Sequence, residues 1–237
     1  YFADMKYKHL FFDLDHTLWD FRTNSRATLR ELHAELGLAE HGIDDADELI
    51  DAYEEVNAGL WRRYEQGRIP KEVLRVLRFR NTLGRFGVRD ERLAHRLATD
   101  YLDRSPRKPA LHAGVRALLE DLATDHALHI ITNGFQEVQG IKLESSGIAS
   151  HFDVVLTSEQ AGAAKPDPRI FRRAMDLAGA VAEESLMVGD DARNDTGGAR
   201  GAGLDQAHFI GEPGTEPDAE ATYRFAHFAE LHRLLRG

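Results

Sequence analysis

Hydrophobic and polar residues follow two different patterns along this chain of 237 residues. Residues 7–14, YKHLFFDL, form a short apolar run that ends in polar residues, as expected of a buried β-strand. Between residues 24 and 105, apolar residues recur at the helical period of three to four positions. This region predicts four helices and no strand, and its segments open with the cap or first-turn residues Asn24, Asp44, Pro70 and Asp90.

The pattern changes at residue 114, where helical and strand-like segments begin to alternate. Strands are predicted over residues 127–134, 152–158, 185–190 and 205–210, and helices over 114–126, 135–148, 167–179, 192–203 and 225–237. Such alternation is typical of βαβ units that build a parallel sheet. The sequence therefore predicts an α/β core of residues 1–20 and 106–237, with an all-helical domain of residues 21–105 inserted after the first strand.

Composition and charge indicate which kinds of molecule this protein is not expected to bind. The net charge is −10 and no block of five or more basic residues occurs, which argues against nucleic-acid polymers and anionic membranes. The chain has no cysteine, and it has no run of about 18 apolar residues that would predict a transmembrane helix. These features fit a cytoplasmic protein. The 12 histidines are scattered without an HxH or HExxH pair, so they give no sign of a transition-metal site.

Polar side chains that suit chemistry follow nearly every predicted strand, and ligands of an open parallel sheet bind beyond those carboxyl ends. They are Asp13, Asp15 and Thr17 after the first strand, Thr132, Asn133 and Gly134 after the next, Lys165 after the third, and Asp190, Asp191, Asn194 and Asp195 after the fourth. Clustered carboxylates need a compensating cation. A set of oxygen ligands without His or Cys points to a hard ion, most of all Mg²⁺.

The other residues of this set meet the needs of phosphoryl transfer. Lys165 supplies a fixed positive charge, and Thr132 with the backbone N–H groups around Asn133 and Gly134 can hold phosphate oxygens. A carboxylate is also a recognised nucleophile toward phosphorus, with which it forms an aspartyl-phosphate. We therefore interpret the set as a site for phosphoryl transfer.

Four motifs, in this order, resemble those of the haloacid dehalogenase (HAD) superfamily: DLDHT, ITNG, KPDPRIF and GDDARND. The resemblance covers the α/β core, roughly residues 6–20 and 106–237, and implies a Rossmann-like parallel sheet, the HAD fold. It implies that Asp13 is the nucleophile and a metal ligand. It also implies that Asp15 is the general acid/base and binds the metal through its backbone carbonyl.

The resemblance assigns roles to the later motifs too. Thr132 and Asn133 would hold the phosphoryl group, and Lys165 would neutralise Asp13 and the phosphate. Asp190 would be the third protein ligand of Mg²⁺. The metal-binding acid of the last motif varies in the family, so Asp191 and Asp195 are kept as alternative or outer ligands.

The same family contains dehalogenases and sugar-phosphate mutases. A dehalogenase needs no acid to protonate a halide and no Mg²⁺, and the residue two after its nucleophile is usually not Asp. Here that residue is Asp15, and Asp190 is available for metal, which favours a phosphatase. A mutase, or a phosphatase of sugar phosphates or phosphoglycolate, stays open. An inactive phosphate-binding module is disfavoured because every motif position needed for turnover is intact.

In this family, a helical insertion between the first two motifs is a mobile cap that closes over the site, and residues 21–105 fit that type. Trp61, Tyr64 and Phe79 in it can stack on a flat ring, and Arg78 can meet a polar edge or a phosphate. The phrases FDLDHTLWDF and LWRRYEQGRIPKEVLRVLRF look like those of pyrimidine 5′-nucleotidases of the HAD family. The expected protein is a Mg²⁺-dependent nucleoside 5′-monophosphatase that prefers pyrimidines, acts on a small phosphorylated metabolite, and is a monomer or homodimer.

Overall fold

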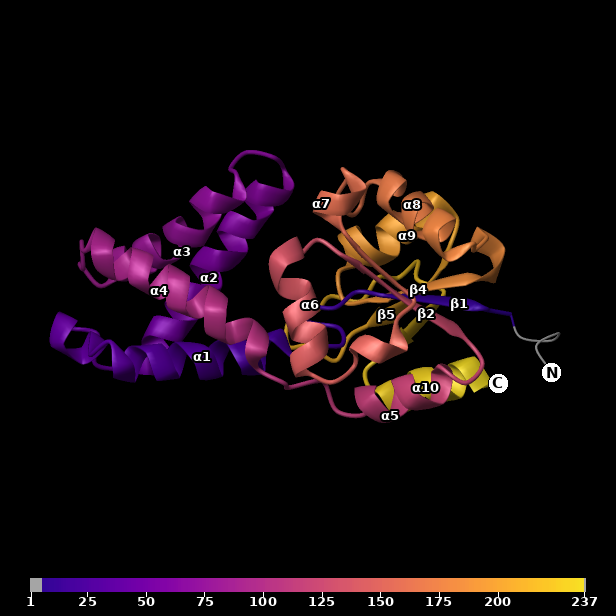
Figure 1. The fold of residues 1–237 in the computed structure, drawn as a ribbon, viewed down its shortest axis with the longest axis horizontal. Coiled ribbons are helices and arrows are strands. Elements are labelled where there is room, and N and C mark those ends of the chain that lie inside the picture. The colour runs from indigo at the N-terminus through magenta and orange to yellow at the C-terminus, as the bar shows by residue number, and fades with distance from the viewer. Residues whose placement is uncertain (1–5, 237) are drawn as a thin grey trace. The chain divides into compact units, whose positions relative to one another are not determined.

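The computed structural model describes residues 6–236 and divides into two compact units, shown as a ribbon in Figure 1. The first unit consists of the chain up to Phe21 and from Pro109 onward, and the second is the helical segment Arg22–Lys108. The sequence predicted this segment over residues 21–105. Residues 1–5 of the predicted core and Gly237 of the predicted last helix lie outside the described residues.

A six-stranded parallel sheet forms the centre of the first unit. Its strands are β1 (His9–Phe12), β2 (Ala127–Thr132), β3 (Val154–Thr157), β4 (Ser185–Gly189), β5 (Asp205–Phe209) and β6 (Tyr223–Phe225). They lie in the order β3-β2-β1-β4-β5-β6, which confirms the predicted Rossmann-like α/β fold. The chain builds outward from β1 through β2 and β3, then from β4 on the other side. The topological switch point therefore lies where β1 and β4 end side by side.

Helices cover both faces of the sheet because its buried strands carry apolar side chains on both sides (Figure 1). Leu10 and Phe12 of β1 pack on one face, against α5 (Val115–Leu122), α6 (Gln136–Ser145) and α10 (Phe228–Arg236). Phe11 points to the other face, toward α8 (Pro168–Ala178) and α9 (Gly198–Ala202). The short helix α7 (Ser158–Ala161) follows β3, and turns η3 (Ala149–His151), η4 (Ala182–Glu184) and the π-helical η5 (Ala192–Gly197) complete this unit.

The C-terminal region differs from the prediction. Residues 223–225 form strand β6 beside β5, and the last helix begins at Phe228 instead of residue 225. A three-residue strand is too short to show a period in the sequence. It exists because its backbone pairs with β5, which is a tertiary contact.

All the regular elements of the second unit are helices, as the sequence predicted. It contains α1 (Phe21–Glu35), α2 (Ala46–Glu65), α3 (Lys71–Arg85) and α4 (Glu91–Arg104), with turns η1 (Leu38–His41) and η2 (Ser105–Arg107). Helix α2 is capped by Asp45, not by the predicted Asp44, and α1 begins at Phe21, before the predicted Asn24. The predicted cap Asp90 is correct, since its carboxylate accepts from the N–H groups of the first turn of α4.

Two of the residues expected to meet the substrate belong to the core of the helical unit. Phe79 is 2 % exposed and packs against Tyr53 and Tyr101, and Arg78 is 3 % exposed with its guanidinium carbon 4.8 Å from the Tyr101 ring centroid. Their burial favours a packing role over direct substrate contact. Trp61 and Tyr64 are half-buried on α2, with ring centroids 5.4 Å apart.

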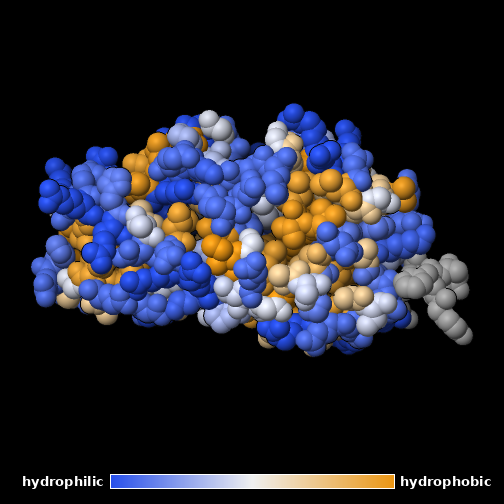
Figure 2. Space-filling model, viewed as in Figure 1, coloured by the Kyte–Doolittle hydropathy of each residue, from blue (hydrophilic) through white to orange (hydrophobic). Residues whose placement is uncertain are grey.

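Hydrophilic residues cover much of the face shown in Figure 2, with hydrophobic residues between them. The large hydrophobic side chains that are exposed are Val73, Leu177, Val181 and Leu234, which come from separate helices and loops. Within the described part of the chain, none of the helices combines the length and apolar character needed to span a membrane.

Candidate active site

The loop after β1 carries the first two acids of the predicted site. Asp13 is 6 % exposed, and its backbone N–H donates to the carbonyl of Val188 in β4 at 2.9 Å, which extends the strand pairing. The chain then turns back, with the N–H of Trp19 donating to the carbonyl of Leu14 at 2.8 Å. Within this turn His16 has a φ of 68°, in a region that non-glycine residues seldom occupy. The turn thus brings both acids to the switch point of the sheet.

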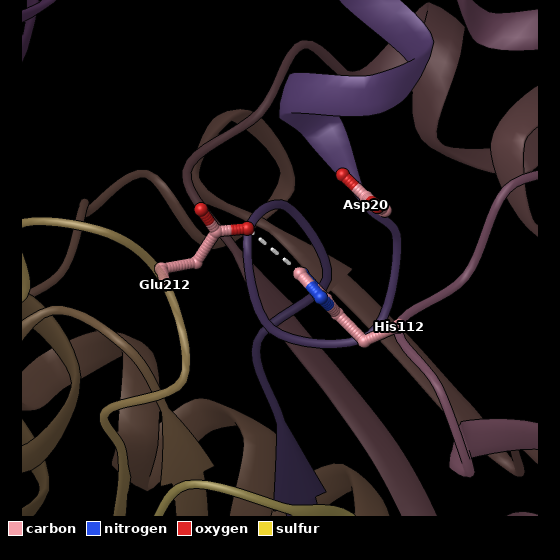
Figure 3. Close-up of side chains that lie close together, drawn as sticks. All are labelled: Asp20, His112 and Glu212. Carbon is pink, nitrogen blue, oxygen red and sulfur yellow. Dashed lines mark ion pairs between the residues drawn. The ribbon is translucent and has the colours of Figure 1, made fainter.

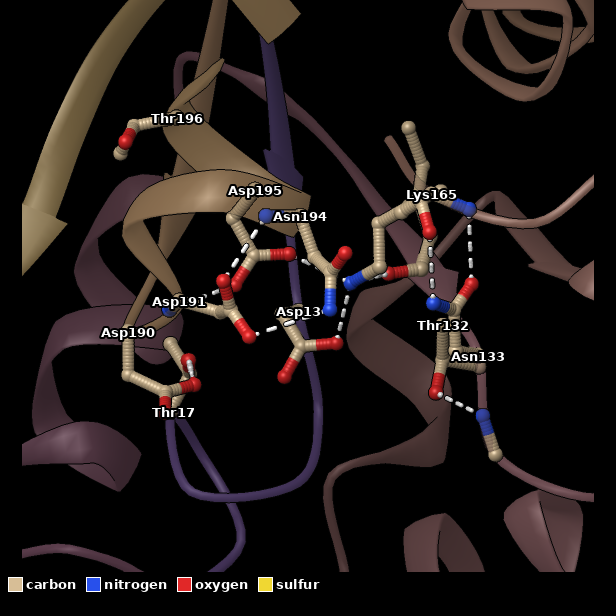
Figure 4. Close-up of polar contacts among 12 residues, drawn as sticks. Asp13, Thr17, Thr132, Asn133, Lys165, Asp190, Asp191, Asn194, Asp195 and Thr196 are labelled. Carbon is tan, nitrogen blue, oxygen red and sulfur yellow. Dashed lines mark hydrogen bonds and ion pairs between the residues drawn. The ribbon is translucent and has the colours of Figure 1, made fainter. Parts of the chain in front are cut away.

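Lys165 links two of the predicted acids. Its ammonium donates to Asp13 Oδ1 at 2.5 Å, to Asp195 Oδ1 at 2.6 Å and to the carbonyl of Ile131 at 2.9 Å (Figure 4). These three acceptors use all three N–H donors of a lysine that is 3 % exposed. Burial by itself would lower the pKa of Lys165, but the two carboxylates raise its pKa above the ordinary value, so the side chain is a fixed cation.

Asp13, Asp190 and Asp195 lie together, with one oxygen of each within 4.8 Å of the others. Burial raises the pKa of all three carboxyl groups, that of Asp13 to about 7. Lys165 pairs with two of these three carboxyl groups, Asp13 and Asp195, so a further cation is needed for all three to be charged together. The charge and the oxygen-only donors fit a divalent ion such as Mg²⁺.

The structure separates the two acids that the sequence kept as alternative ligands. Asp195 is 1 % exposed and belongs to the acidic group. Asp191 is exposed, and its carboxylate caps η5 by accepting from the N–H groups of Arg193 and Asn194 at 2.8 Å each. Its backbone N–H donates to Asp195 at 3.0 Å, so Asp191 orients the buried acid through its main chain.

Asp190 is held from two sides, and one of its neighbours was not expected. The Thr17 hydroxyl donates to Asp190 Oδ1 at 2.9 Å (Figure 4). The fully buried His208 has Nε2 2.8 Å from the Asp190 carbonyl, while its Nδ1 accepts from the N–H of Asp218 at 2.9 Å. Because Nδ1 accepts, Nε2 carries the proton and donates. Nothing in the sequence distinguished His208 from the other histidines.

Thr132, the last residue of β2, and Asn133 form hydrogen bonds with neighbouring residues of the protein. Asn133 uses both ends of its amide on the backbone of Lys165, accepting from its N–H at 2.8 Å and donating to its carbonyl at 3.0 Å (Figure 4). Thr132 accepts from the N–H of Gly134 at 3.0 Å and from Gln139 Nε2 at 3.3 Å. Its hydroxyl proton is therefore free to be donated to a ligand.

Asp15 has two partners that the sequence analysis missed. Lys142 Nζ donates to Asp15 Oδ1 at 2.5 Å, and Gln139 Nε2 donates to Oδ2 at 3.0 Å. Burial would raise the pKa of Asp15, but Lys142 and Gln139 favour the charged form and the pKa is lowered. The available signal was a glutamine and a lysine on the buried face of α6, beside Val138 and Leu143.

A second group of possible ligands lies elsewhere in this unit. Oxygens of Asp20 and Glu212 and a nitrogen of His112 come within 4.8 Å of one another (Figure 3). His112 Nε2 is 3.0 Å from Glu212 Oε1. The distance is that of an ion pair, but the geometry at His112 Nε2 is not that of a hydrogen bond. We therefore interpret the group as a contact between the loop after β5 and the segment before α5.

The fold and the site together define a class of enzyme. A parallel sheet with a buried lysine among acids at the ends of β1 and β4 is the arrangement of haloacid dehalogenase-like hydrolases. The profile of that family matches residues 7–203, and this chain belongs to it. The resemblance seen in the four motifs is thereby confirmed, and the chain is a hydrolase.

Two relatives and one solved structure are similar over most of the chain. Pyrimidine 5′-nucleotidase PynA of Streptococcus pneumoniae is 34 % identical over 203 residues, covering 85 % of this chain and 83 % of that protein. Pyrimidine 5′-nucleotidase YjjG of Escherichia coli is 31 % identical over 233 residues, covering 98 % and 99 %. The HAD-hydrolase YfnB of Bacillus subtilis, solved bound to magnesium and showing interdomain movement, has a TM-score of 0.85 at 27 % identity, covering 98 % of this chain and all of that one.

Proposed function

We propose that this hydrolase is a Mg²⁺-dependent phosphomonoesterase that acts through an aspartyl-phosphate. The observation that carries the proposal is the group of Asp13, Asp190 and Asp195, of which the buried Asp13 and Asp195 pair with the ammonium of Lys165. Such a group places a carboxylate nucleophile beside a fixed cation, in a region where charge on a transferring phosphoryl group is stabilised without water. A bound Mg²⁺, held by Asp13, Asp190 and the carbonyl of Asp15, would supply charge neutralisation for the phosphoryl oxygens.

The proposed course has two steps. Asp13 attacks phosphorus in line, the bond to the leaving oxygen breaks, and Asp15, which has to enter this step with a proton on its carboxyl group, gives that proton to the leaving oxygen. Asp15 then takes a proton from water, which attacks phosphorus and releases phosphate and free Asp13. Lys165 favours the ionised form of Asp13 against the burial that raises the pKa of Asp13, and the Thr132 hydroxyl donates to a phosphoryl oxygen.

Asn133 has a supporting part in this proposal. Its amide fixes the backbone of Lys165, and it thereby aims the ammonium at Asp13 and Asp195. The predicted contact of Asn133 with the phosphoryl group stays a prediction. In the described structure the amide oxygen accepts from the N–H of Lys165 and one of the two amide N–H groups donates to the carbonyl of Lys165. The second N–H is the group that could donate to a phosphoryl oxygen.

We further propose nucleoside 5′-monophosphates, pyrimidine nucleotides above all, as substrates. The support is the similarity to PynA and YjjG over most of each chain. We assign the helical unit Arg22–Lys108 the role of a cap that selects the leaving group, with Trp61 and Tyr64 as candidates for contact with a base. Arg78 and Phe79 stay weaker candidates because they are buried in the unit's own core.

A purified-protein assay tests these proposals separately. Release of p-nitrophenol from p-nitrophenyl phosphate, with Mg²⁺ and with EDTA, tests the phosphatase, and Asp13→Asn should abolish it. The exposed Asp176→Asn serves as the matched control and should retain activity. Full activity in EDTA or in Asp13→Asn would refute the mechanism. A panel of UMP, dUMP, dTMP, AMP, sugar phosphates and phosphoglycolate tests the substrate class, and much faster turnover of sugar phosphates would refute the nucleotide preference.

A further inference from the structure

The carboxylate of Asp15 is held at two points by one helix. Lys142 binds Oδ1 and Gln139 binds Oδ2, and these two residues are three positions apart on α6, so they lie on the same helix face. With one donor on each oxygen, the carboxylate plane has a defined orientation. Asp15 makes no comparable contact with the Lys165 group, since none of the described partners of Lys165 is Asp15.

Lys142 is placed unusually for a lysine. Its side chain is 8 % exposed, and its ammonium lies 4.6 Å from the ring centroid of Trp19 and 5.8 Å from that of Phe21. Burying an ammonium costs several kcal/mol unless it is paired, and aromatic faces offset only part of that cost. Asp15 is the partner that makes this position tenable. The two rings and Asp15 therefore surround the ammonium of Lys142.

Gln139 links Asp15 to the motif after β2. Its Nε2 also lies 3.3 Å from Thr132 Oγ1, so one amide group bridges the acid/base residue and the predicted phosphate donor. Gly134 permits this contact. A Cβ at Gly134 would stand 1.4 Å from Gln139 Nε2, so any larger residue would displace the amide.

We propose that Gln139 and Lys142 are positioning residues that hold Asp15 in the orientation for proton transfer to and from the phosphoryl site. The inference rests on the proposed phosphatase function and goes beyond it, because it assigns a catalytic effect to two residues outside the four motifs. They act only through Asp15. Misplacement of a proton donor by about 1 Å can cost about 100-fold in rate, so their removal should be measurable.

The test is a double-mutant cycle between Lys142→Met and Asp15→Asn, with kcat measured on UMP and on p-nitrophenyl phosphate. In the wild-type background Lys142→Met should lower kcat about 100-fold and leave KM within about threefold, because it misplaces a proton donor and not the substrate. In the Asp15→Asn background it should change kcat by less than about threefold, because the residue it positions is already disabled. An equal loss in both backgrounds would overturn the proposal.

The leaving group gives a second readout. The first turnover of UMP needs a proton on the leaving alkoxide, whereas p-nitrophenolate leaves without one. Lys142→Met should therefore slow the first turnover of UMP far more than that of p-nitrophenyl phosphate. Equal slowing of the two substrates would mean that the variant damages the site as a whole, and it would overturn the inference.

Two more variants keep the proposal testable if Lys142→Met does not fold. Gln139→Leu removes the donor to Oδ2 of Asp15 without leaving a buried charge. It should lower kcat about tenfold when Asp15 is present and leave kcat unchanged in the Asp15→Asn background. The exposed Lys8→Met is the matched control, and it should leave kcat unchanged within twofold. Failure of the proposed function itself is seen separately, since then the wild type hydrolyses no ester or Asp13→Asn stays active.

Discussion

His129 makes the stability of this protein depend on pH. It lies on β2 at 1 % exposure, with Nε2 3.1 Å from Nδ1 of His9 on the neighbouring strand and its ring stacked on that residue at 5.4 Å. Burial, followed by the nearby His9, lowers the pKa of His129 from 6.5 to about 4. The folded protein therefore keeps this imidazole neutral at pH values where an unfolded chain protonates it.

The direction in which stability changes with pH follows from proton uptake by the unfolded chain. Between pH 6.5 and about 4 the unfolded chain binds a proton at His129 that the folded chain does not, so stability falls as the pH is lowered. Each pKa unit corresponds to about 1.36 kcal/mol, which gives a full effect of about 3 kcal/mol below pH 4. At pH 5.0 the loss relative to pH 8.0 is about 2 kcal/mol from this residue.

Urea unfolding of the wild type and of His129→Gln at pH 8.0 and 5.0 measures the effect. The glutamine variant cannot titrate, so its free energy of unfolding should fall by about 2 kcal/mol less between the two pH values. The exposed His227→Gln is the control and should follow the wild type. If His129→Gln and the wild type lose the same free energy, then His129 is protonated in the folded protein and the reasoning is refuted.

Other predictions concern single contacts. Lys165→Met should abolish turnover and cost about 3–5 kcal/mol in urea unfolding, because it leaves buried carboxylates unpaired; a change below 1 kcal/mol would contradict this. Gly198→Ala should cost about 1–3 kcal/mol, since its Cβ would lie 2.7 Å from the Phe171 ring, and an unchanged Tm would refute it. Arg236→Gln should lower Tm slightly at pH 7 and by less at pH 3, because Arg236 lowers the pKa of Asp121 below 3.8 and that stabilisation is lost progressively as the carboxylate protonates; equal Tm losses at both pH values would argue against the pairing. Removal of Mg²⁺ by EDTA should abolish turnover and its return should restore it, as judged by phosphate release.

Much of the fold could be read from periodicity because the hydrophobic effect acts on local pattern. Leu10, Phe11 and Phe12 form an unbroken apolar run because β1 is covered on both faces. Residues 24–105 have the helical period because each helix buries one side in a common core. The prediction failed where a strand forms only because it pairs with another strand. The three residues of β6 are extended because they pair with β5.

The sequence also determined which kinds of residue gather at the site. Acids, threonine, asparagine and lysine follow strands of one parallel sheet, and the carboxyl ends of such strands share one edge. The sequence pattern alone therefore predicts that Asp13, Lys165 and Asp190 lie together, and in the structure Lys165 Nζ is 2.5 Å from Asp13 Oδ1. The sequence therefore determined which types of side chain form the site and that they lie at the carboxyl edge of the sheet.

Only the tertiary structure decided how those groups are shared out. Asp191 and Asp195 are alike in the sequence, yet Asp191 precedes η5 and caps it, whereas Asp195 lies within η5 and is buried against Lys165. Lys142 meets Asp15 across 127 positions of chain, and no local pattern encodes such a distance. Periodicity reports which face of an element is buried, whereas the partner of a buried charge depends on how separate elements pack.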